Sequence, residues 1–320
     1  MSPPRTRTLG ATLALAATVL ACRAEAPADR APGTVTREAS PPLDAPGLVI
    51  ERGVVFLGSV GDSSLTVLWL FTAHTRPGVV DRTARAWLAR GGAWEPFLEE
   101  RWETAPTRVP WRVHPHGRLR LVIGAGETLE ALVFSEGLRR LEVAIGGPRV
   151  EWNGSQGETF LVADGAAVLA EQRIPGLVLD FARARRGETP PPGDWMFLTS
   201  GDSVQMVLTE IESPAGRESS SYEGWGWLQD ESEFPWRDVT VAWVKRRAFE
   251  RARRDVPVTW RVTSPDGEMS AELAVQTANL EAGAGQGPQL PVDALFEVAG
   301  TLRVGEGVYP VRGLVRHVQQ

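Results

Sequence analysis

The sequence contains one cysteine, Cys22, among its 320 residues. A single thiol cannot form an intramolecular disulfide, so the folded part of the chain must be stabilised by its hydrophobic core. The sequence also has no G-x-S-x-G nucleophile motif and no glycine-rich phosphate-binding loop. It therefore carries no signature of a serine or cysteine nucleophile, or of a P-loop nucleotide site.

Histidine and lysine are also scarce, with four histidines and a single lysine, Lys245. His114 and His116 flank Pro115 in a predicted turn, but no third ligand lies near them in the sequence. We therefore predict no metal site, and we expect no cofactor. The net charge of -6 comes from acidic residues spread along the chain, which argues against a nucleic-acid partner.

The N-terminus has the features of an export signal. Arg5 and Arg7 precede an apolar run, Leu9 to Ala21, that is too short to span a bilayer in the mature protein. Residues 19–22, Val-Leu-Ala-Cys, resemble the lipobox of bacterial lipoproteins, in which the cysteine is acylated and becomes the new N-terminus. We predict a lipoprotein signal peptide at 1–21 and lipidation of Cys22. The alternative is an ordinary secretory signal that contains a cysteine.

Residues 22–47 are rich in proline, alanine and charge and have no apolar periodicity. Such a segment cannot bury enough surface to offset its ordering entropy, so we predict a disordered, lipidated tether. A flexible segment of this length would hold the folded part on the order of 30 Å from the lipid. If the chain is sorted as Gram-negative lipoproteins are, Arg23 in place of an aspartate after the cysteine implies a bacterial cell-envelope protein on the periplasmic side of the outer membrane and not on the inner membrane.

From residue 48 onward, short apolar runs are separated by clusters of glycine, aspartate, serine and proline. Examples are 54–57, 65–70, 119–123, 204–208 and 256–262. Runs of this length between turn signals indicate antiparallel strands, and proline and glycine are too frequent for long helices. We therefore predict an all-β protein. The basic stretch Val239 to Arg254 alternates apolar and polar residues in its first half, which predicts a strand followed by a charged turn or a short helix.

The sequence also repeats itself. Three blocks recur in the same order at similar spacing. Phe56-Leu57 with Gly61-Asp62-Ser63 recurs as Phe197-Leu198 with Gly201-Asp202-Ser203. Trp87-Leu88 recurs as Trp227-Leu228, and Trp111-Arg112-Val113 recurs as Trp260-Arg261-Val262. We infer two homologous antiparallel β-barrels or sandwiches in tandem. The predicted domains are 48–183 and 195–320, with a proline-rich linker at 184–194.

Tryptophan is abundant, with twelve residues, whereas tyrosine occurs only twice. The tryptophans of the repeated blocks are predicted core residues, because indole fills large interior volumes. The run from Tyr222 to Trp227 alternates aromatic residues with glycines, which fits either the wall of a binding cavity or packing. The predicted ligand-binding residues are Trp195, Tyr222, Trp225, Trp227 and Phe296.

The C-terminal half contains a series of spaced residues: Asp194 to Leu198, Pro257 to Trp260 with Pro265, Phe296-Glu297, Gly300, and Gly307 to Tyr309 with Gly313. This series resembles the second domain of the lipocalin-like AttH and carotenoid-hydratase (hydroxyneurosporene synthase) family. The resemblance covers roughly 195–313. It implies two tandem lipocalin-like β-barrels, in agreement with the internal repeat.

The resemblance also implies a mechanism. The hydratases add water across an isoprenoid double bond without a cofactor, which requires an acid that protonates an alkene carbon. Relatives carry a His-Glu-Trp element before the second barrel, and in the comparable stretch, Gly165 to Arg173, only Glu171 or Gln172 can correspond to it. The candidate proton donors are Glu171, Tyr222 and Glu297.

Three functions remain open from the sequence. The first is a membrane-anchored, non-enzymatic binding protein for a hydrophobic or amphipathic small molecule, which could serve an ABC-type exporter. The second is a cofactor-free hydratase or hydrolase, a hydro-lyase in the carotenoid-hydratase case, that acts on an isoprenoid or a lipid. The third is a surface structural or carbohydrate-binding module.

Overall fold

The computed structural model describes residues 47–107, 112–125, 128–155, 157–186, 193–212, 219–229 and 233–320. The predicted signal peptide, Cys22, most of the predicted tether and Trp111 lie outside these ranges. In the described part of the chain, no helix has the length and apolar character that a membrane crossing requires.

The described residues form seventeen strands. The first nine are β1 (Leu48–Val60), β2 (Ser63–Arg76), β3 (Val79–Arg90), β4 (Ala93–Thr104), β5 (Leu119–Ile123), β6 (Leu129–Glu136), β7 (Arg139–Asn153), β8 (Thr159–Leu169) and β9 (Gln172–Arg186). The remaining eight are β10 (Trp195–Thr199), β11 (Val204–Glu212), β12 (Ser219–Leu228), β13 (Glu233–Phe249), β14 (Arg254–Thr263), β15 (Met269–Ala282), β16 (Val292–Val304) and β17 (Gly307–Gln319). Both groups belong to one compact unit, Pro42–Gln320.

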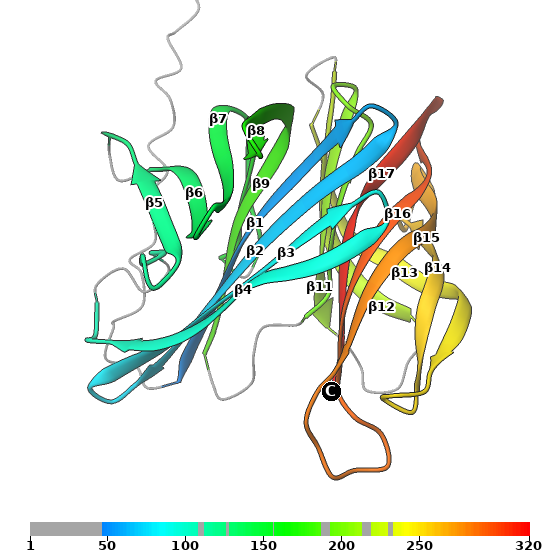
Figure 1. Ribbon diagram of the computed structural model, residues 1–320. Helices are drawn as coiled ribbons and strands as arrows, with labels where there is room; N and C mark the ends of the chain where they lie inside the picture. Colours follow the sequence, from blue (N-terminus) through cyan, green and yellow to red (C-terminus); the bar gives the residue numbers. More distant parts are fainter. Residues whose placement is uncertain are drawn as a thin grey trace, which may run out of the picture. The chain divides into compact units, whose positions relative to one another are not determined.

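The strands form two antiparallel sheets, which confirms the predicted all-β, lipocalin-like class. The first is a curled nine-stranded sheet in the order β4-β3-β2-β1-β9-β8-β7-β6-β5, and the second is a closed barrel of β10 to β17 (Figure 1). The barrel closes because β10 pairs with both β11 and β17. The first sheet is not closed, since β4 and β5 stand at its two edges.

Both sheets begin with the hairpin that the repeated blocks predicted. Gly61 turns the chain from β1 into β2 and Gly201 lies between β10 and β11, at φ angles of 58° and 54°. Glycine adopts this left-handed conformation without steric cost. The basic stretch after Val239 is also as predicted, because β13 runs to Phe249 and a turn joins it to β14.

Alternation along the strands produces three apolar layers. On β2, Val67 and Trp69 point into the concave side of the curled sheet, whereas Leu68 and Leu70 point the other way. The latter pack against outward-facing residues of the barrel, such as Phe197. The convex back of the first sheet therefore forms a shared core with the outer wall of the barrel.

The interior of the barrel is filled by large side chains. The rings of Trp260 and Phe296 meet edge to face with centroids 5.3 Å apart, and both are buried. Gly226 leaves room for the ring of Trp236, because a Cβ at this glycine would lie 2.5 Å from that ring. Phe296 and the glycines of the Tyr222 to Trp227 run thus contribute to packing of the barrel core.

Candidate functional site

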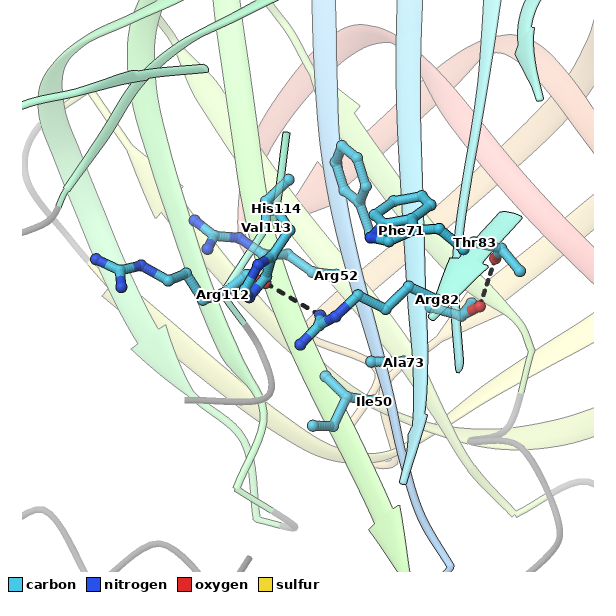
Figure 2. Close-up of a pocket in the computed structure, with 11 residues that line it drawn as sticks. Ile50, Arg52, Phe71, Ala73, Arg82, Thr83, Arg112, Val113 and His114 are labelled. Carbon is cyan, nitrogen blue, oxygen red and sulfur yellow. Dashed lines mark hydrogen bonds between the residues drawn. The ribbon is translucent and has the colours of Figure 1, made fainter. Parts of the chain in front are cut away.

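A hollow lies at one end of the concave side of the first sheet. It has a volume of about 260 Å³, including space open to solvent, and its enclosed part has room for about one water molecule. Its lining comes from β1 to β4 and from the segment that follows β4: Ile50, Arg52, Phe71, Thr72, Ala73, Arg82, Thr83, Trp102, Arg112, Val113 and His114. Figure 2 shows the Arg82 side chain reaching from β3 toward Arg112.

Arg82 is the most buried cation of the hollow, with 5% of its surface exposed. Its Nε donates to Thr104 Oγ1 at 3.0 Å and its Nη1 donates to the backbone carbonyl of Arg112 at 3.3 Å. Burial lowers the pKa of this guanidinium from its ordinary value. Arg82 therefore joins β3 and β4 to the segment that carries Arg112 and His114, and it places a poorly hydrated positive charge in the hollow.

Of the neighbouring lining residues, His114 is held toward its neutral form and Arg52 is paired with a carboxylate. Burial lowers the pKa of His114, and the charges of Arg82 and Arg112 lower it further. His114 Nε2 is buried and has no hydrogen-bond partner among the described residues. Arg52 contributes less positive potential, because Asp180 accepts hydrogen bonds from its Nε and Nη2 at 2.9 and 2.5 Å.

The lining residues include no carboxylate of their own. An anion that enters this hollow would therefore meet Arg82, Arg112 and the buried Nε2 of His114, and no lining residue would repel it.

An apolar surface continues from the hollow along the concave side. Phe71 and Val113 belong to the concave core, and Trp102, Leu121 and Leu129 pack against that core while staying partly exposed. On the edge strand β5, Val122 and Ile123 are 44% and 45% exposed. The concave side of this unclosed sheet therefore carries a positively charged hollow at one end and an apolar surface next to it.

The tryptophans predicted to bind ligand lie elsewhere. Trp195, Trp225 and Trp227 belong to the shared core between the sheets or pack against it. The ring centroid of Trp195 is 5.0 Å from that of Phe181, and that of Trp225 is 5.0 Å from that of Phe160. These indoles join the two sheets and do not line the hollow.

Tyr222 lies inside the barrel and takes part in a buried polar cluster. Its hydroxyl donates to Asp194 Oδ2 at 3.2 Å, and the same oxygen lies 2.6 Å from His317 Nδ1. Burial raises the pKa of Tyr222 well above its ordinary value, and the negative charges of Asp194 and Glu210 add to this effect. At neutral pH the tyrosine is therefore protonated and serves as a donor to Asp194.

The other two predicted proton donors lie at separate places. Glu171 is exposed in the two-residue turn between β8 and β9, where Ala170 and Glu171 have φ angles of 47° and 69°. Glu297 is 5% exposed and accepts hydrogen bonds from Thr66 Oγ1 at 2.6 Å and Thr277 Oγ1 at 3.2 Å. None of the three donors lines the hollow.

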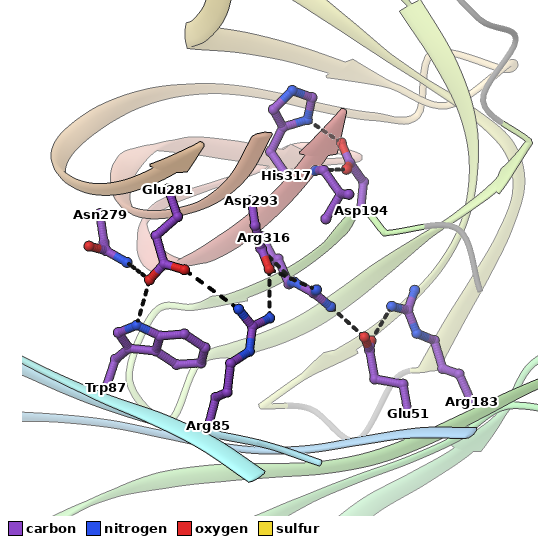
Figure 3. Close-up of polar contacts among 11 residues, drawn as sticks. Glu51, Arg85, Trp87, Arg183, Asp194, Asn279, Glu281, Asp293, Arg316 and His317 are labelled. Atoms are coloured by element: carbon purple, nitrogen blue, oxygen red, sulfur yellow. Dashed lines mark hydrogen bonds and ion pairs between the residues drawn. The ribbon is translucent and has the colours of Figure 1, made fainter. Parts of the chain in front are cut away.

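An ion-pair network crosses the contact between the two sheets (Figure 3). Glu51 on β1 accepts hydrogen bonds from Arg183 on β9 and Arg316 on β17. Asp293 on β16 pairs with Arg316 at 3.1 Å and with Arg85 on β3 at 2.7 Å. We refer to these five residues as the inter-sheet network.

The network holds both of its carboxylates in the charged form. Burial alone would raise the pKa of Glu51, but Arg316 and Arg183 outweigh burial and lower it. The pKa of Asp293 is lowered in the same way, by Arg316 and Arg85 against burial.

The described residues contain no group of three or more histidine, cysteine, aspartate or glutamate side chains placed to hold a metal ion. His116 instead stacks on the indole of Trp102, with ring centroids 4.7 Å apart and an interplanar angle of 4°. His114 turns toward the hollow.

The sequence interpretation did not identify Arg82, Arg112 or Asp194 as site residues. Arg82 could have been noticed, because on β3 it shares the face of Ala84 and Ala86, and both alanines are fully buried. Arg112 and Asp194 precede strands, and nothing in their sequence neighbourhood indicates which strands they meet.

Comparison with known proteins shows the fold. No protein-family model and no curated protein matches the chain. The structure is similar to that of a protein assigned as AttH from Nitrosomonas europaea, with a TM-score of 0.57 and 12% identity over 86% of this chain and 92% of that one. It is also similar to kievitone hydratase from Nectria haematococca, with a TM-score of 0.52 and 11% identity over 88% and 90% of the two chains. The lipocalin-like fold expected from the family resemblance is therefore confirmed.

Proposed function

We propose that this chain is a non-enzymatic binding protein for an amphipathic small molecule whose anionic head enters the hollow at Arg82. The observation that carries this proposal is the composition of the hollow. Three arginines, a histidine and apolar side chains line it, and none of the lining residues is acidic.

The size of the hollow indicates which part of the ligand it takes. Its enclosed part holds about one water molecule, and the volume of about 260 Å³ includes space open to solvent, so only the oxygens of a carboxylate, sulfonate or phosphate group would enter while the rest of the ligand stays outside. Arg112 and His114 come from the segment after β4, and Arg82 holds this segment through the backbone carbonyl of Arg112 (Figure 2). Charge-assisted hydrogen bonds from guanidinium groups would fix the position of the head.

The apolar part of the ligand would lie along the concave side toward β5. Partly exposed apolar side chains on that path, such as Leu121 and Leu129, would lose contact with water when a hydrocarbon chain covers them. Each buried methylene contributes about 0.8 kcal/mol.

The predicted lipid anchor would place this binding activity next to a membrane. A protein tethered through acylated Cys22 at the periplasmic side of the outer membrane would take up or deliver an amphipathic molecule near a bilayer. An ABC-type exporter is a suitable partner, since it releases such molecules into the same compartment. Both statements belong to the proposal and rest on the sequence alone.

A titration that follows tryptophan fluorescence tests the proposal, because Trp102 lines the hollow. The full chain should bind dodecanoate and should bind dodecanol much more weakly, since the alcohol has no charge for the arginines. Arg112→Gln should weaken dodecanoate binding roughly tenfold, as expected for the loss of one charge-assisted hydrogen bond.

Arg101→Gln is the matched control, because Arg101 is an exposed arginine on β4 whose side chain is 78% accessible. It should leave the affinity for dodecanoate unchanged. Equal affinity for the acid and the alcohol, or no fluorescence response to either ligand, would contradict the proposal.

A second function, hydration of an isoprenoid or lipid, is favoured by one observation. Asp194 links Tyr222 to His317 in the barrel, and these three side chains have the residue types of a proton-transfer chain. Incubation of the full chain with acyclic isoprenoids would then yield a hydrated product. That product should disappear in Tyr222→Phe if this cluster carries the reaction, and in Glu171→Gln if the turn residue does.

A further inference from the structure

A groove of about 590 Å³ lies on the outer wall of the barrel, over β13 to β16. Its lining residues are Lys245, Thr259, Arg261, Thr263, Ser270, Ala271, Glu272, Ala274, Ala299, Gly300, Thr301 and Arg303. This set shares no residue with the hollow of the first sheet. Its volume falls within the usual range of small-molecule binding sites.

Strand register explains how these residues come together. Arg261, Glu272 and Thr301 are direct neighbours across β14, β15 and β16, and Ser270 and Arg303 form the next pair along β15 and β16. Inward-facing residues between them, such as Val262, fill the barrel core, so the polar set points outward.

Small residues form the floor of the groove. Ala274, Ala299 and Gly300 lie between the polar side chains. A Cβ at Gly300 would lie only 1.9 Å from the carbonyl oxygen of Glu272, so only glycine lets β15 and β16 approach this closely. A ligand could therefore reach the wall of the barrel while longer side chains surround it.

The side chains that line the groove have a net positive charge. Lys245, Arg261 and Arg303 are exposed, and none of their side chains forms an ion pair or hydrogen bond with the described residues. Glu272 is the one acidic side chain of the lining, so three positive charges against one negative charge leave an excess of two. The whole chain, by contrast, has a net charge of -6.

Hydroxyl groups accompany these cations. The side chains of Thr263, Ser270 and Thr301 line the groove and make no hydrogen bond with the described residues. Neighbouring strands are about 4.8 Å apart, so Arg261 and Arg303, two strands from each other, can both reach one anion held between them. The hydroxyls can bind the remaining oxygens of such a ligand, since each both donates and accepts.

We infer that this groove binds a phosphate-bearing polar group, such as the glycerol phosphate of an anionic phospholipid or of a soluble phosphate ester. The arginines and Lys245 would bind the phosphate oxygens, and the threonine and serine hydroxyls would bind the adjacent hydroxyls. Glu272 would accept a hydrogen bond from a ligand hydroxyl. This site is independent of the hollow and of the function proposed for it.

The test uses the full chain with Cys22→Ser, which cannot be acylated. Calorimetric titration with glycerol 3-phosphate, and with glycerol as the uncharged counterpart, measures binding of a soluble ligand. Co-sedimentation with phosphatidylcholine vesicles, with and without phosphatidylglycerol, measures binding to the same chemistry in a membrane. The signal segment is identical in every variant compared, so differences between variants report on the groove.

We expect binding of glycerol 3-phosphate or of the phosphatidylglycerol vesicles, and the arm that responds identifies the source of the phosphate. Arg261→Gln/Arg303→Gln should weaken that binding at least tenfold. Arg173→Gln/Arg237→Gln removes the same charge from two other exposed arginines and should have little effect. These substitutions are on the surface, and thermal unfolding will verify that both variants fold.

Three results would overturn the inference. The first is absence of binding in both arms, and the second is equal binding of glycerol and glycerol 3-phosphate. The third is an equal loss of binding in the groove variant and in the control variant, because general charge and not the groove would then attract the ligand.

Discussion

Substitution of Glu51 by glutamine tests whether the inter-sheet network fixes the contact between the two sheets. Glu51 lies between the guanidinium groups of Arg183 and Arg316, and all three side chains are 8% exposed or less. Glutamine has nearly the same shape but no charge, so two buried cations would face a neutral amide. Removing one partner from a buried ion pair typically costs about 3–5 kcal/mol, because the remaining charge is left uncompensated.

The assay is equilibrium unfolding in urea of the wild type, Glu51→Gln and a matched control. Glu103→Gln serves as the control, because Glu103 pairs with Arg76 at 3.5 Å on the surface, where its side chain is 67% exposed. An exposed pair of this kind contributes about 0–1 kcal/mol. The free energy of unfolding should therefore fall by several kcal/mol in Glu51→Gln and by less than about 1 kcal/mol in the control. Equal losses in the two variants would refute the reasoning.

Three further predictions follow from single features of the structure. Wild-type stability should fall as the pH drops below about 4.5 in acid titrations followed by circular dichroism, and less so in Glu51→Gln. The reason is that Glu51 and Asp293 have lower pKa values folded than unfolded, so their stabilisation is complete above the unfolded values and is lost as they protonate. Gly300→Ala should cost about 1–3 kcal/mol in urea unfolding because its Cβ would meet the Glu272 carbonyl, whereas Gly147→Ala, with open space around it, should be neutral. Binding of dodecyl sulfonate should strengthen as the pH falls below about 6.5 in the wild type but not in His114→Gln. A bound anion raises the lowered pKa of His114, so the protonated histidine favours the bound state. Calorimetry at several pH values measures the affinity.

The strands and hairpins were predictable because their signals are local. Period-two alternation and turn glycines such as Gly61 and Gly201 depend only on neighbouring residues, and the structure agrees with them. Closure of a sheet is not local. β4 and β5 stand at opposite edges of the first sheet, and the five residues of β5 carry no signal that distinguishes an edge strand from a closing one.

The tryptophans show why the candidate site was harder to predict. Trp195 and Trp225 point outward from the barrel, where a sequence pattern indicates either a solvent-facing or a ligand-facing side chain. They are buried only because the convex side of the other sheet covers them, and such a contact joins residues far apart in the sequence. Arg82 and Arg112 meet for the same reason, 30 residues apart in the chain.

The most direct test of the proposed anion site is the ionisation of a bound carboxylate. Carbon-13 NMR of carboxyl-labelled dodecanoate, bound to the full chain and titrated with acid, reports the pKa of that carboxyl group. If the head lies among Arg82, Arg112 and His114, its pKa should fall well below the value of the free acid. A pKa above the free value would place the carboxyl group in an apolar interior and would contradict the account.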